Sequence, residues 1–145
     1  MKMIVRTTCI AIASMSIFSS CKKDDDNGNR LELLTTGSWK LVSTQEKVNN
    51  GAWVEYIDDY EDCSLDDYLK FNTNSLVEFN AGPTLCDPSE DQSYTVPWSF
   101  EDGQSKINIE GDLANIETLN SNTLTVTFIE VDGGVTYYYK DVFNH

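Results

Sequence analysis

The residues best equipped for chemistry are acidic side chains gathered around two cysteines. Nine carboxylates flank Cys63 and Cys86 in the chain: Asp58, Asp59, Glu61, Asp62, Asp66, Asp67, Asp87, Glu90 and Asp91. Hard oxygen ligands of this kind suit calcium, so five of these residues form a candidate metal site: Asp58, Asp59, Asp62, Asp66 and Asp87. The run lacks the spaced Asp-x-Asp-x-Asp-Gly loop of an EF-hand. A solvated acidic surface is therefore the favoured interpretation, and no metal or other cofactor is predicted.

Catalytic side chains are scarce. The single histidine is His145, so a Ser-His-Asp array and a histidine metal cluster both lack their central part. The paired carboxylates Asp66 and Asp67 are the remaining candidates for acid–base work, and no predicted pocket contains them. The sequence therefore predicts a protein that is not an enzyme.

The charge balance limits the partners. Ten Lys and Arg against 24 Asp and Glu give the chain a net charge of −14. Residues 31–145 alone carry 21 acidic and five basic side chains, a charge of −16. Such a surface repels polyphosphate chains, so we predict no nucleic-acid partner.

The first twenty residues indicate an exported protein. A basic start, Met1 to Arg6, precedes an apolar run from Thr7 to Phe18, which is too short to cross a bilayer. The ending Ser19-Ser20-Cys21 resembles the lipobox of bacterial lipoproteins, which implies that residues 1–20 are a signal peptide and that Cys21 carries the lipid.

The segment after this cysteine is polar. Residues 21–30 contain no apolar side chain up to Asn29 and are predicted to form a flexible acidic tether. Its Lys22-Lys23-Asp24 run resembles the signal that sends Bacteroidota-type lipoproteins to the outer face of the outer membrane. We therefore expect a membrane attachment through the N-terminal lipid, with palmitate among its chains, at the cell surface. A simple spacer on a lipoprotein that faces the periplasm is the alternative.

The other cysteines are predicted to pair. Cys9 leaves with the signal and Cys21 takes the lipid, which leaves Cys63 and Cys86 as an even pair in an oxidising compartment. A disulfide that closes a loop of about 24 residues contributes roughly 3 kcal/mol in the chain-entropy model. A thiol nucleophile or metal pair is the alternative, but no histidine partner and no Cys-x-x-Cys spacing supports it.

Period-two alternation dominates residues 31–145. Leu31 to Gly37 reads as a short helical turn, and Asn49-Asn50-Gly51 predicts a tight hairpin between a strand from Trp39 and one over Ala52–Ile57. Further strands are predicted over residues 68–72, 76–80, 92–101, 106–110, 113–119, 123–131 and 135–143. Short strands joined by tight turns favour an all-β domain: an antiparallel up-and-down β-barrel of about eight strands after a short N-terminal helical turn.

One register per strand predicts which side chains face the barrel interior. The candidate ligand-binding residues are Trp39, Leu41, Phe71, Phe79, Trp98, Phe128 and Tyr137. Tyr138 falls on the outer face, and with Trp53 and Tyr56 it is a candidate for an exposed glycan-binding or protein-binding patch. Aromatic residues are common in strands, so ordinary packing is the favoured interpretation of these three.

Several motifs together resemble a known family. Gly37-Ser38-Trp39 resembles the Gly-x-Trp signature that opens the lipocalin barrel, where the tryptophan plugs the closed end. The wider pattern adds five segments: Cys63, Tyr68-Leu69-Lys70-Phe71-Asn72, Cys86-Asp87-Pro88, Trp98-Ser99-Phe100 and Ser121-Asn122-Thr123-Leu124. Over residues 31 to 143 the chain thus resembles the lipocalin-like domain of Bacteroidota lipoproteins.

This resemblance implies a binding module. The leading hypothesis is a monomeric lipoprotein whose barrel holds a small apolar or amphipathic ligand. The domain is shorter than a true lipocalin, so a filled barrel remains an alternative, in which the acidic loops recognise a basic protein partner. An internal void large enough for a ligand would distinguish the two.

Overall fold

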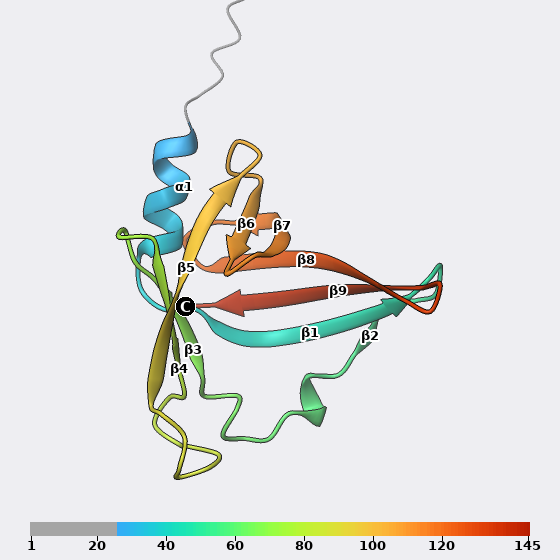
Figure 1. The fold of residues 1–145 in the computed structure, drawn as a ribbon, viewed down its shortest axis with the longest axis horizontal. Helices are drawn as coiled ribbons and strands as arrows, with labels where there is room; N and C mark the ends of the chain where they lie inside the picture. The colour runs from blue at the N-terminus through green and yellow to red at the C-terminus, as the bar shows by residue number, and fades with distance from the viewer. Residues whose placement is uncertain (1–25) are drawn as a thin grey trace, which may run out of the picture.

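The computed structural model describes residues 26–145, and side chains from Asn29 onward. The described chain forms one antiparallel sheet in the order β2-β1-β9-β8-β7-β6-β5-β4-β3, with helix α1 at one end (Figure 1). Its elements are α1 (Asp26–Thr35), β1 (Lys40–Val48), β2 (Val54–Glu55), the 3-10 turn η1 (Ile57–Asp59), β3 (Tyr68–Phe71), β4 (Leu76–Asn80), β5 (Ser93–Glu101), β6 (Lys106–Ile109), β7 (Asp112–Leu119), β8 (Thr123–Asp132) and β9 (Val135–Asn144). The predicted all-β, up-and-down fold is confirmed. Cys21, the predicted signal peptide and most of the predicted tether lie outside the described residues.

The sheet curls until β1 meets β3 at a single point. Trp39 and Leu69 form an isolated antiparallel bridge, with N–H···O distances of 2.8 and 2.9 Å. No continuous ladder joins β1 to β3 in residues 26–145, and β2 lies beyond β1 as an edge. The curled sheet is therefore fastened at one end and is not sealed along a whole strand.

Trp39 plugs the fastened end. Its side chain is fully buried, and the indole Nε1–H donates to the carbonyl oxygen of Leu34 in α1 at 2.9 Å. The ring of His145 packs against the indole with centroids 3.8 Å apart, and its Nδ1 lies 2.8 Å from the Ser38 carbonyl oxygen. A buried apolar cluster surrounds the plug: Leu34, Phe71, Val77, Trp98, Ile107, Leu124 and Val126. The role implied for Trp39 by the Gly-x-Trp resemblance agrees with this position.

Helix α1 begins earlier than the sequence indicated. It starts at Asp26, so residues 26–30, which were predicted to belong to the tether, are helical. A tertiary contact outweighs the polar composition here, because the Arg30 Nε–H donates to the Gln104 carbonyl oxygen at 3.1 Å. The first helical turns are thus part of the structure that closes the end of the sheet.

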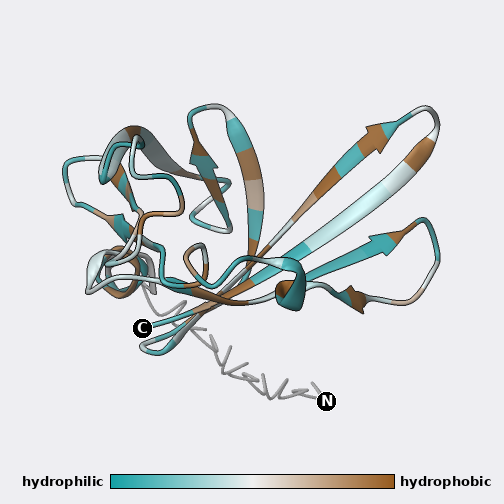
Figure 2. Cartoon of the chain, turned by 90° about the horizontal axis from the view of Figure 1, so that it is seen from below, coloured by the Kyte–Doolittle hydropathy of each residue, from teal (hydrophilic) through white to brown (hydrophobic). Residues whose placement is uncertain are grey.

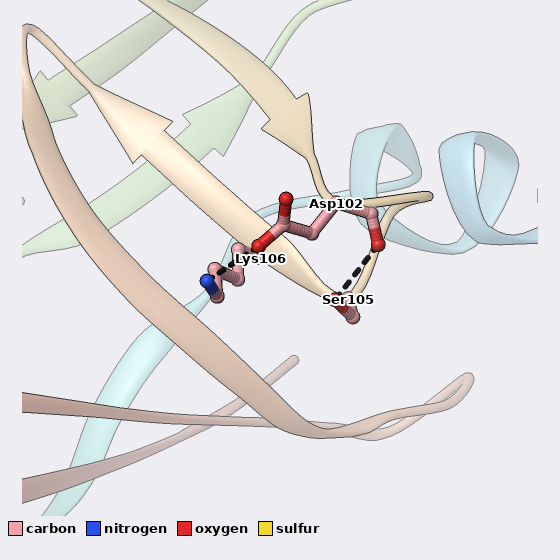
Figure 3. Close-up of polar contacts among 3 residues, drawn as sticks. All are labelled: Asp102, Ser105 and Lys106. Carbon is pink, nitrogen blue, oxygen red and sulfur yellow. Dashed lines mark hydrogen bonds and ion pairs between the residues drawn. The ribbon is translucent and has the colours of Figure 1, made fainter.

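The carbonyl that receives Arg30 belongs to the β5–β6 turn. Asp102, Gly103 and Gln104 all have positive φ there, between 49° and 69°. The Ser105 hydroxyl donates to the Asp102 carbonyl oxygen at 2.9 Å, and Lys106 forms an ion pair with the Asp102 carboxylate (Figure 3). These contacts fix a strained turn in the position where α1 docks against it.

A hairpin forms where it was predicted, because β1 and β2 are antiparallel neighbours with a turn at Asn49-Asn50, but it is not tight. The two strands pair only at Gln45–Glu55 and Glu46–Val54 and not next to a two-residue turn. The backbone N–H of Asn49 instead donates to the Thr136 carbonyl oxygen of β9 at 2.7 Å. β1 therefore continues along β9, and the β1–β9 ladder extends to Val48 opposite Tyr137.

The ends of β1, β8 and β9 project as an arm, on the right in Figure 1. The β7–β8 ladder ends at the Asn115–Thr127 pair, so the remainder of β8 is paired only with β9. Figure 2 shows hydrophobic and hydrophilic stretches alternating along several strands, as the period-two pattern requires. Within the described part of the chain, none of the helices has both the length and the apolar character needed to cross a membrane.

Candidate functional site

Two cavities lie against the inner face of the curled sheet. The first has a volume of about 750 Å³ and the second about 390 Å³. Leu69 of β3 and Phe143 of β9 line both, so the two cavities are neighbours. Small-molecule sites in proteins are commonly about 300–1,000 Å³ and mostly apolar. Either cavity is therefore large enough to receive a small ligand.

The first cavity lies between the plug and the disulfide-bearing loops. Its apolar wall comes from β1, β3, β4 and the start of β5, and contains Trp39, Leu41, Leu69, Phe79 and Tyr94. The rings of Phe79 and Tyr94 stack with centroids 5.0 Å apart. The loops contribute Tyr60 and three carboxylates, Asp67, Glu90 and Asp91. Burial, followed by the negative charges of Asp66 and Glu90, raises the pKa of Asp67.

The second cavity lies between β3 and the strands β6 to β9. Its wall is apolar over most of its extent, with Phe71, Ile107, Ile109, Ala114, Leu124, Val126 and Phe128. The rings of Phe128 and Tyr139 stack with centroids 4.9 Å apart. Three carboxylates, Asp112, Glu130 and Asp141, supply its charged groups. Asp112 and Glu130 are exposed, whereas Asp141 is half-buried.

A buried threonine orients Asp141. The Thr44 hydroxyl on β1 donates to the Asp141 carboxylate on β9 at 2.7 Å, and Thr44 itself is only 2% exposed. A β-bulge between Leu41 and Ser43 shifts the β1 register, so that Thr44 pairs directly with Asp141. Burial raises the pKa of Asp141, and the hydrogen bond from Thr44 opposes this effect in part.

Two tyrosines of this region, Tyr60 and Tyr139, have raised pKa values. Burial, with contributions from Tyr56 and from the charge of Asp141, raises the pKa of Tyr60. The rings of Tyr56 and Tyr60 have centroids 6.4 Å apart. Burial, followed by the charges of Glu130 and Glu46, raises the pKa of Tyr139. The inner face of the arm therefore combines neutral phenols with carboxylates.

Most of the predicted interior residues lie at the cavities. Trp39, Leu41 and Phe79 line the first cavity, and Phe71 and Phe128 line the second. The two remaining predicted residues line neither: Trp98 is buried between Phe71 and Phe100, with ring centroids 5.3 and 5.2 Å away, and Tyr137 is half-buried opposite Val48 and Glu130.

Sequence reasoning missed the polar pair in the interior. Asp141 lies two residues beyond Tyr139 on β9, so the period-two pattern already places it on the predicted inner face. Strict alternation from Trp39 and Leu41 places Thr44 on the opposite face, and a bulge of one residue leaves no clear signal in this sequence. Phe143 was missed as well, although it belongs to a regular strand whose alternation could have identified it, whereas the alternation of residues 68–72 does place Leu69 on the inner face with Phe71.

The predicted disulfide between Cys63 and Cys86 is confirmed, with Cα atoms 5.3 Å apart. It joins the loop before β3 to the β4–β5 loop. The five candidate calcium ligands do not come together: in residues 26–145, the only group of three potential ligand atoms within 4.8 Å of one another is Glu61 with these two sulfurs. The sulfurs are bonded to each other and are not thiolate ligands.

Two residues of the predicted aromatic patch, Tyr138 and Trp53, contact lysines of β1 and β9. Lys47 Nζ lies 4.2 Å from the ring centroid of Tyr138 and 5.1 Å from that of Trp53. Lys140 Nζ lies 4.5 Å from the Trp53 centroid. Cation–π contacts thus occupy ring faces that a sugar would need for stacking. Packing, the favoured interpretation, agrees with this arrangement.

Three comparisons with known proteins were made, and a family model supplies the match that identifies the family. The family model described as a lipocalin-like domain matches residues 35–127. A solved structure, a deswapped triple mutant of bovine odorant-binding protein, is 15% identical to this chain, with 75% of this chain and 72% of that chain covered and a TM-score of 0.43. The search of curated proteins gave no match. Since the family model covers more than half of the chain, the protein belongs to the family of lipocalin-like domains.

Proposed function

We propose that this protein binds a small apolar or amphipathic molecule inside its curled sheet. The observation that carries the proposal is the pair of cavities on the inner face, of about 750 and 390 Å³, with mostly apolar walls. Lipocalin-like domains typically bind small hydrophobic ligands, and the fold is generally one of binding or transport. A barrel filled by its own side chains would leave no such space, so the cavities favour the ligand-binding hypothesis over the filled alternative.

The walls provide the main driving force for binding. Burial of apolar surface contributes about 25 cal/mol per Å², so each 100 Å² of ligand surface placed against the walls adds about 2.5 kcal/mol before the costs of association. Phe71, Leu124 and Val126 are buried and already ordered, so little side-chain entropy is lost when a ligand contacts them. A ligand with an apolar body of modest size suits the second cavity.

A neutral fluorescent probe tests this proposal. N-phenyl-1-naphthylamine emits strongly only in apolar surroundings, and we expect saturable binding to the folded protein. Ala114→Phe would fill the second cavity, and we expect it to weaken binding at that site at least tenfold. Asn115→Phe, one residue along β7 at an exposed position, is the matched control and should bind as the unaltered protein does.

The result of the probe titration can support the proposed function or contradict it. If the probe binds and only Ala114→Phe weakens it, the cavity is the binding site. If the probe does not bind, the proposed function is wrong. If both variants bind it as tightly as the unaltered protein, the second cavity is not the binding site. Circular dichroism of both variants shows whether the sheet is intact before binding is compared.

We further propose that the domain is attached to the outer membrane through a lipid on Cys21. The support is the lipobox-like ending Ser19-Ser20-Cys21 and the polar, charged segment that follows it. Cys21→Ser should move the protein out of the membrane fraction, whereas Cys9→Ser, the control within the signal segment, should leave it there. Protease treatment of intact cells then separates the surface face from the periplasmic one, since only a surface protein is digested.

A further inference from the structure

The two cavities share one electrostatic property. Every charged side chain that lines them is a carboxylate: Asp67, Glu90 and Asp91 in the first, Asp112, Glu130 and Asp141 in the second. Neither cavity is lined by Lys, Arg or His from the described part of the chain. A site with one sign of charge and low-dielectric walls attracts ligands of the opposite sign. An anionic amphiphile such as a fatty acid would meet repulsion throughout this interior.

Asp141 is the carboxylate best placed to contact a bound ligand. It is half-buried against the apolar wall of the second cavity, and Thr44 holds one carboxylate oxygen at 2.7 Å. The single ion pair found within residues 26–145 is Lys106–Asp102, so Asp141 has no cationic partner there. The neighbouring Lys140 lies on the opposite face, over Trp53. A desolvated carboxylate of this kind gains from a cation that is brought to it.

We propose that the ligand is a cationic amphiphile, with an apolar body in the second cavity and a protonated amine paired with Asp141. This inference rests on the proposed function and adds the chemical class of the ligand. Phe128, Leu124 and Val126 contact the apolar body, and Thr44 positions the carboxylate for the ammonium group.

The attraction of any cation to the negatively charged domain has to be distinguished from the specific pairing of an amine with Asp141. The folded domain carries a charge of −16, so any cation is drawn to its surface. A single neutralised carboxylate elsewhere changes that overall field by the same amount as one at the cavity. Asp132 is suitable for this purpose, because it is exposed in the β8–β9 hairpin that also carries Asp141.

Three probes with the same apolar chain and different head groups provide the test: decylamine, decanol and decanoate, each below its micelle concentration at pH 7. Calorimetric titration should give decylamine an affinity at least tenfold above that of decanol, and decanoate the weakest. Asp141→Asn should abolish the preference for decylamine and leave the affinity for decanol unchanged. Asp132→Asn should keep the preference. The amide of asparagine can still accept the Thr44 hydrogen bond, so the sheet is expected to stay folded.

The results distinguish this inference from the proposed function. If decanol and decanoate bind as well as decylamine, the cavity binds ligands and the cationic class is wrong. If Asp132→Asn removes the preference as fully as Asp141→Asn does, the preference reflects the overall charge and the pairing with Asp141 is wrong. If none of the three probes binds, both the cationic class and the proposed function are wrong.

Discussion

The hydroxyl of Thr44 and the carboxylate of Asp141 form a hydrogen bond of 2.7 Å between two directly paired strands, β1 and β9. The pair faces the interior, where Thr44 is almost completely buried and Asp141 is half-buried. Burial raises the pKa of Asp141 above the ordinary value of an aspartate. The folded protein therefore carries a carboxylate whose charged form is less favourable than in the unfolded chain.

This shift predicts how stability depends on pH. Between the ordinary pKa of aspartate and the raised pKa of Asp141, the folded state binds more protons than the unfolded state, so the free energy of unfolding falls as pH rises through that window. Asp141→Asn removes this contribution. We expect the variant to unfold at a higher temperature than the unaltered protein at pH 7, with the difference disappearing below the ordinary pKa of aspartate.

Thermal unfolding followed by circular dichroism from pH 3 to pH 8 measures the effect. Asp67 also has a raised pKa, and Asp87 and Glu55 have lowered ones, so the difference between variant and unaltered protein is the quantity to compare. Asp132→Asn, at an exposed position, should show no such pH-dependent difference in unfolding temperature. An unfolding temperature for Asp141→Asn that stays equal to or below that of the unaltered protein at pH 7 contradicts the prediction.

The hydrogen bond from the indole Nε1–H of Trp39 to the Leu34 carbonyl oxygen should contribute measurably to the free energy of unfolding. Trp39→Phe keeps an aromatic ring at the plug but leaves the carbonyl of Leu34 without its donor, which sits 2.9 Å away in the unaltered protein. An unsatisfied buried acceptor costs about 1–3 kcal/mol. Urea unfolding should show a loss of at least that size. Trp53→Phe, at a position 36% exposed, should lose less; equal losses would argue against the role of the Trp39 hydrogen bond.

Alternation of residue types was sufficient to predict much of this fold. The strands from β3 to β9 follow the predicted runs closely, because each alternates apolar and polar residues between turn-forming residues. Interactions between distant segments account for the failures. Asn49 bonds to Thr136 on β9, so β1 stays paired with β9 up to the turn and the hairpin with β2 is short, and Arg30 of α1 bonds to a turn far away in the sequence.

The interior polar pair depends on the same kind of non-local information. The bulge that turns Thr44 inward is set by the pairing of β1 with β9, at the opposite end of the chain. Leu69 lines both cavities, and its strand meets the start of β1 through the single bridge to Trp39. Neither relationship follows from residue types near Thr44 or Leu69. The disulfide could be predicted because the number of cysteines left one pair, Cys63 and Cys86, and the prediction did not depend on their surroundings.

Calcium should leave the stability of this domain unchanged. The candidate ligands are dispersed over the loops between β2 and β3 and between β4 and β5, and Asp87 already accepts hydrogen bonds of 2.8 Å from the backbone N–H and the hydroxyl of Ser89. We expect the same unfolding temperature in 1 mM EDTA and in 5 mM calcium chloride at matched ionic strength. Magnesium chloride serves as the control for a general effect of divalent charge. An unfolding temperature that rises by several degrees with calcium and not with magnesium would contradict this prediction and show that the domain has a calcium site.

The Cys63–Cys86 disulfide should contribute about 3 kcal/mol, the value expected for a loop of its length if its main effect is to restrict the unfolded chain. A double variant, Cys63→Ser with Cys86→Ser, should lose that amount in urea unfolding. Neither cysteine lines a cavity, so binding of N-phenyl-1-naphthylamine at the second cavity should persist in the folded variant. A reductant should lower the stability of the unaltered protein to that of the double variant and have no effect on the variant itself. Unchanged stability in the double variant would mean that contacts around the two loops, and not the covalent bond, hold them together.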